Sequence, residues 1–422
     1  MQRNNSMKNF GFLARSLAMV LFSILTNTSY AAAFQLFEQN VVSVENFHAG
    51  RAALIPDAST AYDNPAGIIR IQNQQVVAGA MGIFTDLKFL GQADTCFLGL
   101  CFPTGMNGVV QGGSFSLIPD LHYVAPISPM VGFGLSVVVP YGSDVEWGQT
   151  SFINAISERA RLQVVDIAPA LGFKLTDNLS IGLGADIEKM SAELNSFLLV
   201  ANSINKGYDT AYGYHLGALY EYKNKGRVGA AYHSKVNHNL RGTSNYIGIL
   251  ADRVSTRLIL PPDSTLSIYY RFNPCWAVMG TVVYTQWNVV HNLVLENVAG
   301  LGGLPVDYQM YFRNTFTYSI GADYSPVEPL ILRFGAGYDQ TPTRNAYRIL
   351  QLPDSDRYVL AIGGHYQFSQ TLGIDLGWTR VFFKQAYINP PPLAGIALQQ
   401  VPVGKVDTSA DVAGAQVTWD IL

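Results

Sequence analysis

The chain has 422 residues, of which 49% are hydrophobic and 14% are charged, and its formal net charge is −3. Because an ordinary soluble domain carries about 25% charged residues, this composition, with a mean hydropathy of +0.15, favours a membrane protein. The small acidic net charge argues against a nucleic acid as partner. Beyond the N-terminal region no run of about 18 apolar residues occurs, so we expect no membrane-spanning helix.

Residues 1–31 have the features of a secretory signal peptide. Three cations and no acid precede the apolar stretch "SLAMVLFSIL", and small residues near Ala31 fit a cleavage site. The alternative, a membrane anchor, requires a longer apolar stretch. We therefore expect cleavage after Ala31.

Residues 32–74 differ from the rest of the chain. They contain "HAGRAALIPDASTAYDNPAG", which is rich in Ala and Asp and has little strict alternation. This composition predicts short helices and turns rather than strands. We therefore predict a small N-terminal domain at 32–74, followed by a strand domain at 75–422.

Alternating apolar and polar residues recur throughout 75–422, separated by turn sequences such as "TDN" and "KNKG". Short turns alternate with long loops, such as 195–208 and 388–409, as in outer-membrane barrels. The number of predicted strands is even, as bacterial single-chain barrels require. We predict fourteen strands, at residues 75–87, 115–126, 131–146, 160–175, 179–194, 209–223, 226–241, 255–272, 275–294, 310–325, 330–341, 357–368, 371–387 and 410–422.

The two faces of these strands suit lipid outside and a lumen inside. In "AYGYHLGALYEY", residues 211–222, tyrosines and leucine share one face, and glycines share the other with polar residues. In "TLGIDLGWTRVFF", Asp375 lies on the glycine face, and a carboxylate cannot face hydrocarbon cheaply. In "NLSIGLGADIE" the same rule assigns Ile187 to lipid and Asp186 to the lumen. We therefore predict an all-β fold, an antiparallel transmembrane β-barrel. A soluble two-sheet protein, the alternative, would need apolar residues on both faces.

The chain has three cysteines. Cys96 and Cys101 bracket "CFLGLC" and are expected to form a small disulfide loop, which an exported protein permits. Cys275 is left over, and we interpret it as a small, half-buried thiol. Since no histidine cluster accompanies the thiols, we expect no metal site, and we expect no cofactor.

At "DASTAYDNPAG" the sequence resembles the FadL-type outer-membrane transporters of long-chain fatty acids and other hydrophobic compounds. The resemblance covers essentially the whole mature chain, from "AAFQLFEQN" through "LHYVAPIS" and "VVVPYGSDVEW" to the Pro-Asp-x-Asp-Arg element at 353–357. These motifs occur in the family's order, which makes the match specific. The resemblance implies a monomeric, fourteen-stranded barrel in the bacterial outer membrane, surrounded by lipid and lipopolysaccharide and plugged by an N-terminal helical hatch.

The resemblance also implies a pocket inside the barrel for a long-chain fatty acid or another hydrophobic molecule. The family's pocket is reached by a phenylalanine near the mature N-terminus, which matches Phe34 here. A cation on the tenth strand holds the carboxylate, and the matching residue is Arg313. The family's second cation has no clean match, since Lys189 is displaced by about two positions. A salt bridge at the rim or in the lumen is the alternative role of Arg313.

Two further elements of the resemblance concern gating. Asn64, Pro65 and Ala66 match the turn that holds the family's hatch, and an ordinary Asx-type turn is the alternative.

The second element is a gap in the barrel wall near the third strand, through which ligand leaves sideways. Pro140 has no N–H for the strand ladder, and Gly142 next to Tyr141 permits a bulge. A strand that simply ends at Pro140 is the alternative.

The sequence contains little that indicates an enzyme. Gly-x-Ser-x-Gly, Gly-x-Gly-x-x-Gly and His-Glu-x-x-His are all absent. His215 and His233 are expected on adjacent strands facing the lumen, so an outer-membrane lipase remains one alternative. An open porin, a surface adhesin and an importer of aromatic or aliphatic hydrocarbons are the others.

Overall fold

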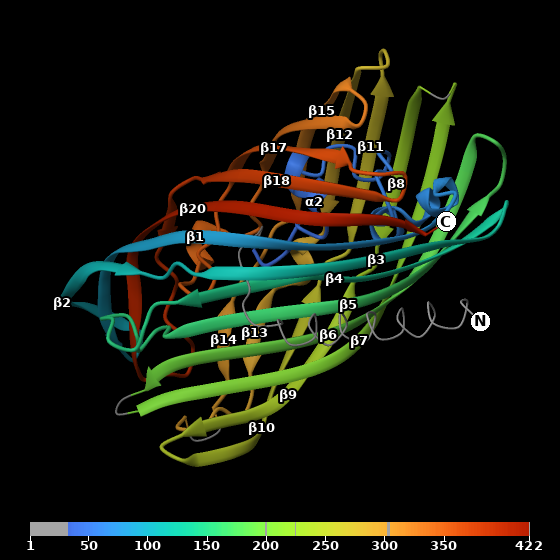
Figure 1. Cartoon of the computed structure of the whole chain (residues 1–422). Coiled ribbons are helices and arrows are strands. Elements are labelled where there is room, and N and C mark those ends of the chain that lie inside the picture. Colours follow the sequence, from blue (N-terminus) through green and yellow to red (C-terminus); the bar gives the residue numbers. More distant parts are fainter. Residues whose placement is uncertain (1–32, 199–200, 224, 302–303, 422) are drawn as a thin grey trace, which may run out of the picture.

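The computed structural model describes residues 33–198, 201–223, 225–301 and 304–421. The predicted signal peptide and its cleavage site therefore lie outside the described residues. Antiparallel strands form a closed barrel around the N-terminal segment, which lies in its interior (Figure 1). No helix in the described part of the chain is long and apolar enough to cross a membrane.

The barrel wall has fourteen positions, as predicted. Of the eighteen strand segments in the sheet, β8 and β9 share one position, β10 and β11 share another, and β2 and β19 only extend the ladders of β1 and β20. Closure comes from β1, which pairs with β3 on one side and with β20 on the other. The wall segments are β1 (Gln74–Phe97), β3 (Phe115–Ser128), β4 (Val131–Glu146), β5 (Arg159–Lys174), β6 (Leu179–Leu198), β7 (Ala201–Tyr222), β8 (Gly226–His233), β9 (Val236–Tyr246), β10 (Ile249–Leu260), β11 (Asp263–Arg271), β12 (Trp276–Thr285), β15 (Thr315–Val327), β16 (Leu330–Asp339), β17 (Arg357–Gln367), β18 (Leu372–Phe383) and β20 (Leu398–Ile421).

The long connections gather at one end of the barrel, here the loop end, and the short turns at the other, the turn end. The loop end contains β2 (Leu100–Gln111), β13 (Asn292–Leu295), β14 (Val306–Gln309), β19 (Ala386–Ile388) and the 3-10 helices η2 (Trp287–Val289) and η3 (Asn345–Tyr347). The predicted disulfide Cys96–Cys101 is present and closes the tip of the β1–β2 hairpin. Cys275 differs from the prediction, because it is exposed in the turn before β12 rather than half-buried.

The strand boundaries differ from the prediction in several places. The predicted loops 195–208 and 388–409 are largely strand, since β7 begins at Ala201 and β20 at Leu398, and the predicted strand 275–294 ends at Thr285, before η2. The predicted strands 226–241 and 255–272 are each broken, the second at Pro261 and Pro262, which have no N–H for a ladder. β1 continues ten residues beyond residue 87, to Phe97, and pairs with β20 along its whole length. The β2 hairpin strand was not predicted, since its sequence alternates little.

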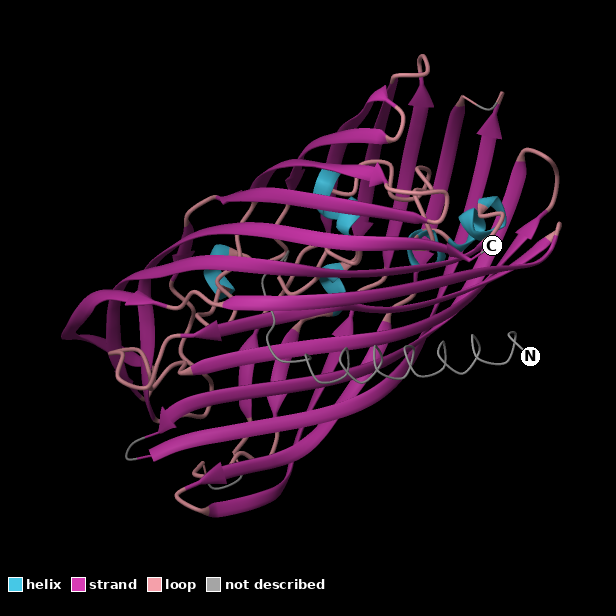
Figure 2. Ribbon diagram, in the orientation of Figure 1, coloured by secondary structure: helices cyan, strands magenta, loops and turns pink. Residues whose placement is uncertain are grey.

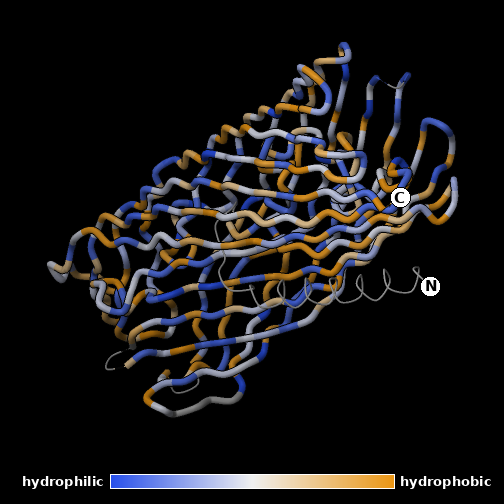
Figure 3. The backbone as a smooth tube through the Cα atoms, in the orientation of Figure 1, coloured by the Kyte–Doolittle hydropathy of each residue, from blue (hydrophilic) through white to orange (hydrophobic). Residues whose placement is uncertain are grey.

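The predicted faces of the wall are confirmed. Tyr212, Tyr214, Tyr220 and Tyr222 are exposed on the outside of β7, whereas His215 of the same strand is fully buried inside. On β6 and β18, Asp186 and Asp375 are likewise buried between exposed apolar neighbours. The alternation of hydrophobic and hydrophilic residues can be followed along the strands in Figure 3.

The hatch is helical, as predicted, and lies inside the barrel (Figure 2). It contains α2 (Val41–Asn46), α3 (Thr60–Asp63) and the 3-10 helix η1 (Pro65–Arg70), which is near the turn end. Glycines on the inner wall let its backbone come close. A Cβ added at Gly229 would lie 1.8 Å from the Ala52 carbonyl oxygen, and one added at Gly182 would lie 2.2 Å from the Pro65 carbonyl carbon.

Candidate ligand path

Residues 34–36, which precede the helices of the hatch and are called the N-terminal segment from here on, pair with β4 at the predicted gap. Leu36 donates its backbone N–H to the Pro140 carbonyl oxygen at 2.8 Å, and Gly142 donates its N–H to the Phe34 carbonyl oxygen at 2.8 Å. Gln35 and Tyr141 face each other across this short antiparallel bridge. Residues 34–36 therefore occupy the position beside β4 that a neighbouring wall strand would take.

This edge of β4 is free because its ladder with β3 stops early. The last pair is Leu121 with Val137, so Pro140, Tyr141 and Gly142 have no partner on β3. On its other side, β4 carries a bulge between Val138 and Tyr141. From this bulge onward the strand is continuously buried, at residues 138–145, instead of alternating.

Phe34 is buried in an apolar cluster inside the barrel. Its ring packs edge-on against Trp287, with 4.9 Å between centroids, and lies 5.9 Å from Tyr141. The indole N–H of Trp287 is buried and has no hydrogen-bond partner. The cluster consists of Ala33, Phe34, Tyr141, Val164, Met190, Ala211, Val236, Leu240, Leu258, Leu260, Trp287, Val290, Met310, Phe312, Ile349 and Leu352.

The Pro-Asp-x-Asp-Arg element anchors the start of this segment. Ala33 donates its N–H to the Asp354 carboxylate at 2.9 Å, and Thr341 donates its hydroxyl to the same oxygen. Burial raises the pKa of the Asp354 carboxyl above its usual value, while Arg357 and the Thr341 hydrogen bond oppose the rise. Asp354 belongs to the Pro-Asp-x-Asp-Arg motif, but no sequence pattern connects that motif with the N-terminus.

A second space lies at the loop end. It has a volume of about 640 Å³ and is lined mostly by apolar and amide side chains. Its walls include Phe152, Leu194, Leu295, Tyr308 and Leu393. The described residues that line it include no lysine or arginine, and Asp307 supplies a buried carboxylate oxygen without a hydrogen-bond partner.

The two predicted carboxylate-binding cations lie outside the apolar cluster. Arg313 precedes β15 by two residues, donates Nε–H to the Thr341 carbonyl oxygen at 3.0 Å, and contacts Asp356 at 3.5 Å. Half of its side chain is exposed. The prediction for Lys189 is wrong: Lys189 lies on the exposed outer face of β6 with Ile187, so it cannot reach a ligand inside the barrel.

The Asn-Pro-Ala turn connects two parts of the hatch to the wall. Asn64 donates its amide N–H to the carbonyl oxygens of Ala52, at 2.7 Å, and Ala218, at 3.1 Å. Its side-chain oxygen accepts the Ala66 N–H at 3.1 Å, and Pro65 begins η1. The side chain rests on Gly217, where an added Cβ would lie 2.0 Å from its oxygen.

The lumenal histidines do not form a serine hydrolase site within the described residues. His215 Nδ1 lies 2.6 Å from the Asp186 carboxylate, but its Nε2 has no hydrogen-bond partner. The hydroxyl of Ser234, the serine next to His233, accepts the backbone N–H of Tyr214. Asp186 and His215 thus resemble the acid and base of a catalytic triad, but no described serine hydroxyl is hydrogen-bonded to His215.

Comparisons with known proteins agree with this architecture. The profile of the family described as "Outer membrane protein transport protein (OMPP1/FadL/TodX)" matches residues 22–421. The long-chain fatty acid transport protein of Escherichia coli strain CFT073 is 26% identical over 86% of this chain and 90% of its own. Outer membrane protein P1 of Haemophilus influenzae is 25% identical over 90% and 92%.

Solved structures show the same fold. A FadL homologue of Pseudomonas aeruginosa superimposes with a TM-score of 0.83 at 24% identity, covering 92% of this chain and all of its own. The Pseudomonas putida toluene transporter TodX gives a TM-score of 0.67 at 17% identity, covering 93% of this chain and all of its own.

Proposed function

Because the chain belongs to the OMPP1/FadL/TodX family of outer membrane transport proteins, we propose that it takes up long-chain fatty acids across the outer membrane as a monomer. The observation that carries the proposal is the bridge between residues 34–36 and the free edge of β4. This segment fills a gap in the wall and also places Phe34 in the apolar cluster. Displacing it would vacate the pocket and open the wall together.

The proposed route has three stages. A hydrophobic molecule enters the cavity at the loop end, moves into the cluster in place of Phe34, and leaves sideways past Pro140 into the membrane. A rearrangement of the hatch accompanies release. The unpartnered indole N–H of Trp287 supports a fatty acid cargo, since it offers a donor to a carboxylate oxygen within the apolar cluster. The names of the relatives that match by sequence support the same cargo.

Aromatic or aliphatic hydrocarbons are the second candidate cargo. The lining of the cavity at the loop end favours them, because Asp307 would repel a carboxylate and none of its described residues is a lysine or arginine. Structural neighbours include transporters of toluene, although at an identity that supports the fold alone.

A binding titration on the purified mature barrel distinguishes the candidates. Oleate, a neutral alkane and an alkylbenzene are each titrated into wild type, Trp287→Phe and Arg313→Ala. Arg257→Ala is the matched control, since Arg257 is exposed on the outer face of β10. If fatty acid is the cargo, oleate binds most tightly, and Trp287→Phe weakens its binding about tenfold or more, the effect of losing a hydrogen bond to a charged group.

The result for Arg313→Ala tests the predicted role of that residue separately. Loss of oleate affinity would assign Arg313 to the carboxylate, whereas an unchanged affinity would leave it as the partner of Asp356. Equal affinity for all three ligands in every variant would favour hydrocarbons. Absence of binding to all three would contradict the transport proposal.

A further inference from the structure

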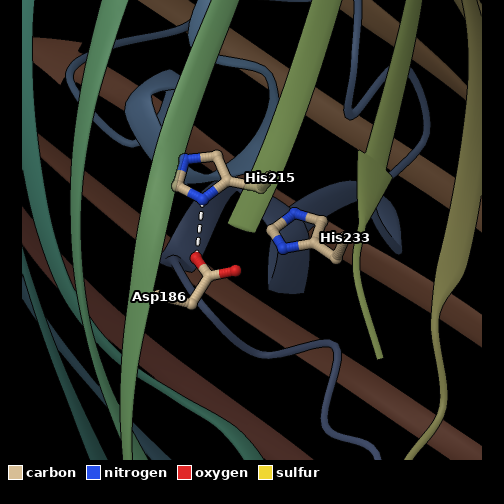
Figure 4. A group of neighbouring side chains, drawn as sticks. All are labelled: Asp186, His215 and His233. Atoms are coloured by element: carbon tan, nitrogen blue, oxygen red, sulfur yellow. Dashed lines mark hydrogen bonds and ion pairs between the residues drawn. The ribbon is translucent and has the colours of Figure 1, made fainter. Parts of the chain in front are cut away.

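Four neighbouring strands carry a row of potential metal ligands on their inner faces. His215 of β7 pairs in register with His233 of β8, which pairs in turn with Asp263 of β11. Asp186 of β6 approaches the same place from the other side. In Figure 4 the carboxylate of Asp186 points toward both imidazole rings.

The first three of these side chains already converge. His215 Nδ1 is 2.6 Å from Asp186 Oδ1, and the two imidazole rings stack with 5.2 Å between their centroids. One ligand atom from each of Asp186, His215 and His233 lies within 4.8 Å of the others. Ligands of a tetrahedral zinc ion are about 3.3 Å apart, given bonds of about 2.0–2.1 Å. Small side-chain rotations would therefore complete the coordination.

Glycines on the neighbouring strands hold these side chains in place. The His215 ring lies on Gly184, where an added Cβ would be 2.1 Å from Cε1. The second carboxylate oxygen of Asp186 lies 3.2 Å from a Cβ added at Gly213. The absence of side chains at both glycines lets the imidazole and the carboxylate lie flat against the wall, facing His233.

Buried polar atoms at this place lack partners. Nε2 of His233 and Oδ1 of Asp263 are buried and make no hydrogen bond. Both residues, with Asp186, line a chamber of about 20 Å³ between the wall, the hatch and the N-terminal segment. That volume is sufficient for one water molecule or one ion. A bound ion or an ordered water would satisfy polar groups in such a place.

The charges around the chamber favour a cation over an anion at this place. Three carboxylates line it, those of Asp186, Glu188 and Asp263. Glu188 is paired with His238 at 3.0 Å. Arg51, the lining guanidinium, is paired with Asp63 at 2.7 Å. The chamber therefore holds more carboxylates than the single guanidinium of Arg51, which also interacts with Asp63 and Asp263, can balance.

We propose that Asp186, His215 and His233 bind one divalent transition-metal ion of the zinc type, with Asp263 on its open side. Two imidazoles with a carboxylate suit Zn²⁺, Cu²⁺ or Ni²⁺, whereas Ca²⁺ and Mg²⁺ require oxygen ligands. The ion would connect β6, β7 and β8 beside Tyr62 of the hatch, whose ring is 4.8 Å from that of His233. The proposal thus departs from the sequence analysis, which expected no metal site.

The test uses the mature, full-length barrel in detergent, with any affinity tag removed and metals stripped by a chelator. Zn²⁺ is titrated calorimetrically, and bound metal is counted by mass spectrometry after dialysis. We expect one Zn²⁺ per chain, with no comparable binding of Ca²⁺. His233→Gln and Asp186→Asn should each weaken Zn²⁺ binding by about tenfold or more, the range seen when groups that support a metal site are removed.

His365→Gln is the matched control. His365 also lies beside a buried carboxylate, that of Asp375, but both of its ring nitrogens are hydrogen-bonded. Its replacement should leave Zn²⁺ binding unchanged. Circular dichroism shows whether each variant keeps its strands. The electron paramagnetic resonance spectrum of the Cu²⁺-loaded protein should show hyperfine coupling to two imidazole nitrogens. Wild type that binds no Zn²⁺, or a control that loses binding equally, would overturn the proposal.

Discussion

Asn64 shows how much of the hatch depends on one side chain. It joins the Ala52 and Ala218 carbonyl oxygens and the Ala66 N–H, so Asn64→Ala leaves three buried backbone groups without that partner. The cost should be about 1–3 kcal/mol in docking of the hatch, the range for unsatisfied buried groups. Hydrogen exchange at residues 60–67 should become faster in this variant.

Asn178→Ala is the control for that measurement. Asn178 also donates its amide to a backbone carbonyl, that of Glu221 at 2.8 Å, but in an exposed turn. Its replacement should leave exchange in the hatch unchanged. Equal protection of the hatch in Asn64→Ala and wild type would mean that the turn is an ordinary Asx-type turn without a holding role.

The inner-wall glycines give a second prediction at this scale. Gly229→Ala would place a Cβ 1.8 Å from the Ala52 carbonyl oxygen, so residues 50–54 must move away from β8. In Gly280→Ala the nearest atom would be 3.6 Å away, which is ordinary contact. Limited proteolysis of the folded barrels should therefore cut the hatch of Gly229→Ala but spare that of Gly280→Ala. Equal resistance of both would mean that the hatch is not seated on these glycines.

Single residues also show what the sequence could predict. Phe34 lies in the interior apolar cluster, where the distance of the family motif from the mature N-terminus predicted an inward-facing ring, and its contact with a ligand stays a prediction. Lys189 was misplaced, although the sequence contained the correction: it shares the face of Ile187, which alternation had already assigned to lipid. Trp287 was not predicted, because η2 interrupts the alternation at that point and burial there depends on distant strands.

Among the elements, β4 and the N-terminal segment form the part of the wall most open to a direct test. Gln35 and Tyr141 are a non-hydrogen-bonded pair, flanked by the bonds of their neighbours. Such pairs have Cα atoms about 4.5 Å apart, within the range for a disulfide. Gln35→Cys with Tyr141→Cys should therefore crosslink the segment to β4. Uptake of ligand should stop under oxidising conditions and return after reduction.

Two controls make this result specific. Cys275→Ser removes the exposed thiol from every variant, and Gln35→Cys alone has no partner for a crosslink. Uptake by the single-cysteine variant should be insensitive to oxidation. Unchanged uptake by the crosslinked protein would mean that ligand passes without moving residues 34–36, which would contradict the proposed lateral route.

The elements were predicted from alternation, and they differ where something other than alternation decides. Pro261 and Pro262 end β10 because neither can donate to a ladder, a signal that was visible in the sequence. The break after β8 could not be predicted from the sequence, because it depends on hydrogen bonds between Ser234 and the backbone of Tyr214 on the neighbouring strand β7. Likewise β1 reaches Phe97 only because β20 begins at Leu398, far away in the chain.

At the scale of the whole molecule, the two ends of the barrel interior are filled differently. The wall closes through β1 and β20 without help from the hatch. The hatch fills the turn end, where it makes polar contacts and packs closely against glycines of the inner wall. The loop end contains the cavity and the apolar cluster. We expect this filling to block a continuous water channel and a hydrophobic cargo to follow the apolar surfaces.

Removing the hatch should convert this barrel into an open pore. Deletion of residues 33–73 leaves every wall strand and its ladders intact, while it removes the groups that occupy the inner glycines. In planar bilayers the wild type should conduct little, and the deletion variant should give large, steady conductance, because water and ions can then fill the polar lumen. Circular dichroism of the reconstituted protein checks that the strands persist. High conductance in the wild type would contradict a closed plug, and low conductance in a folded deletion variant would mean that the long loops, rather than the hatch, close the barrel.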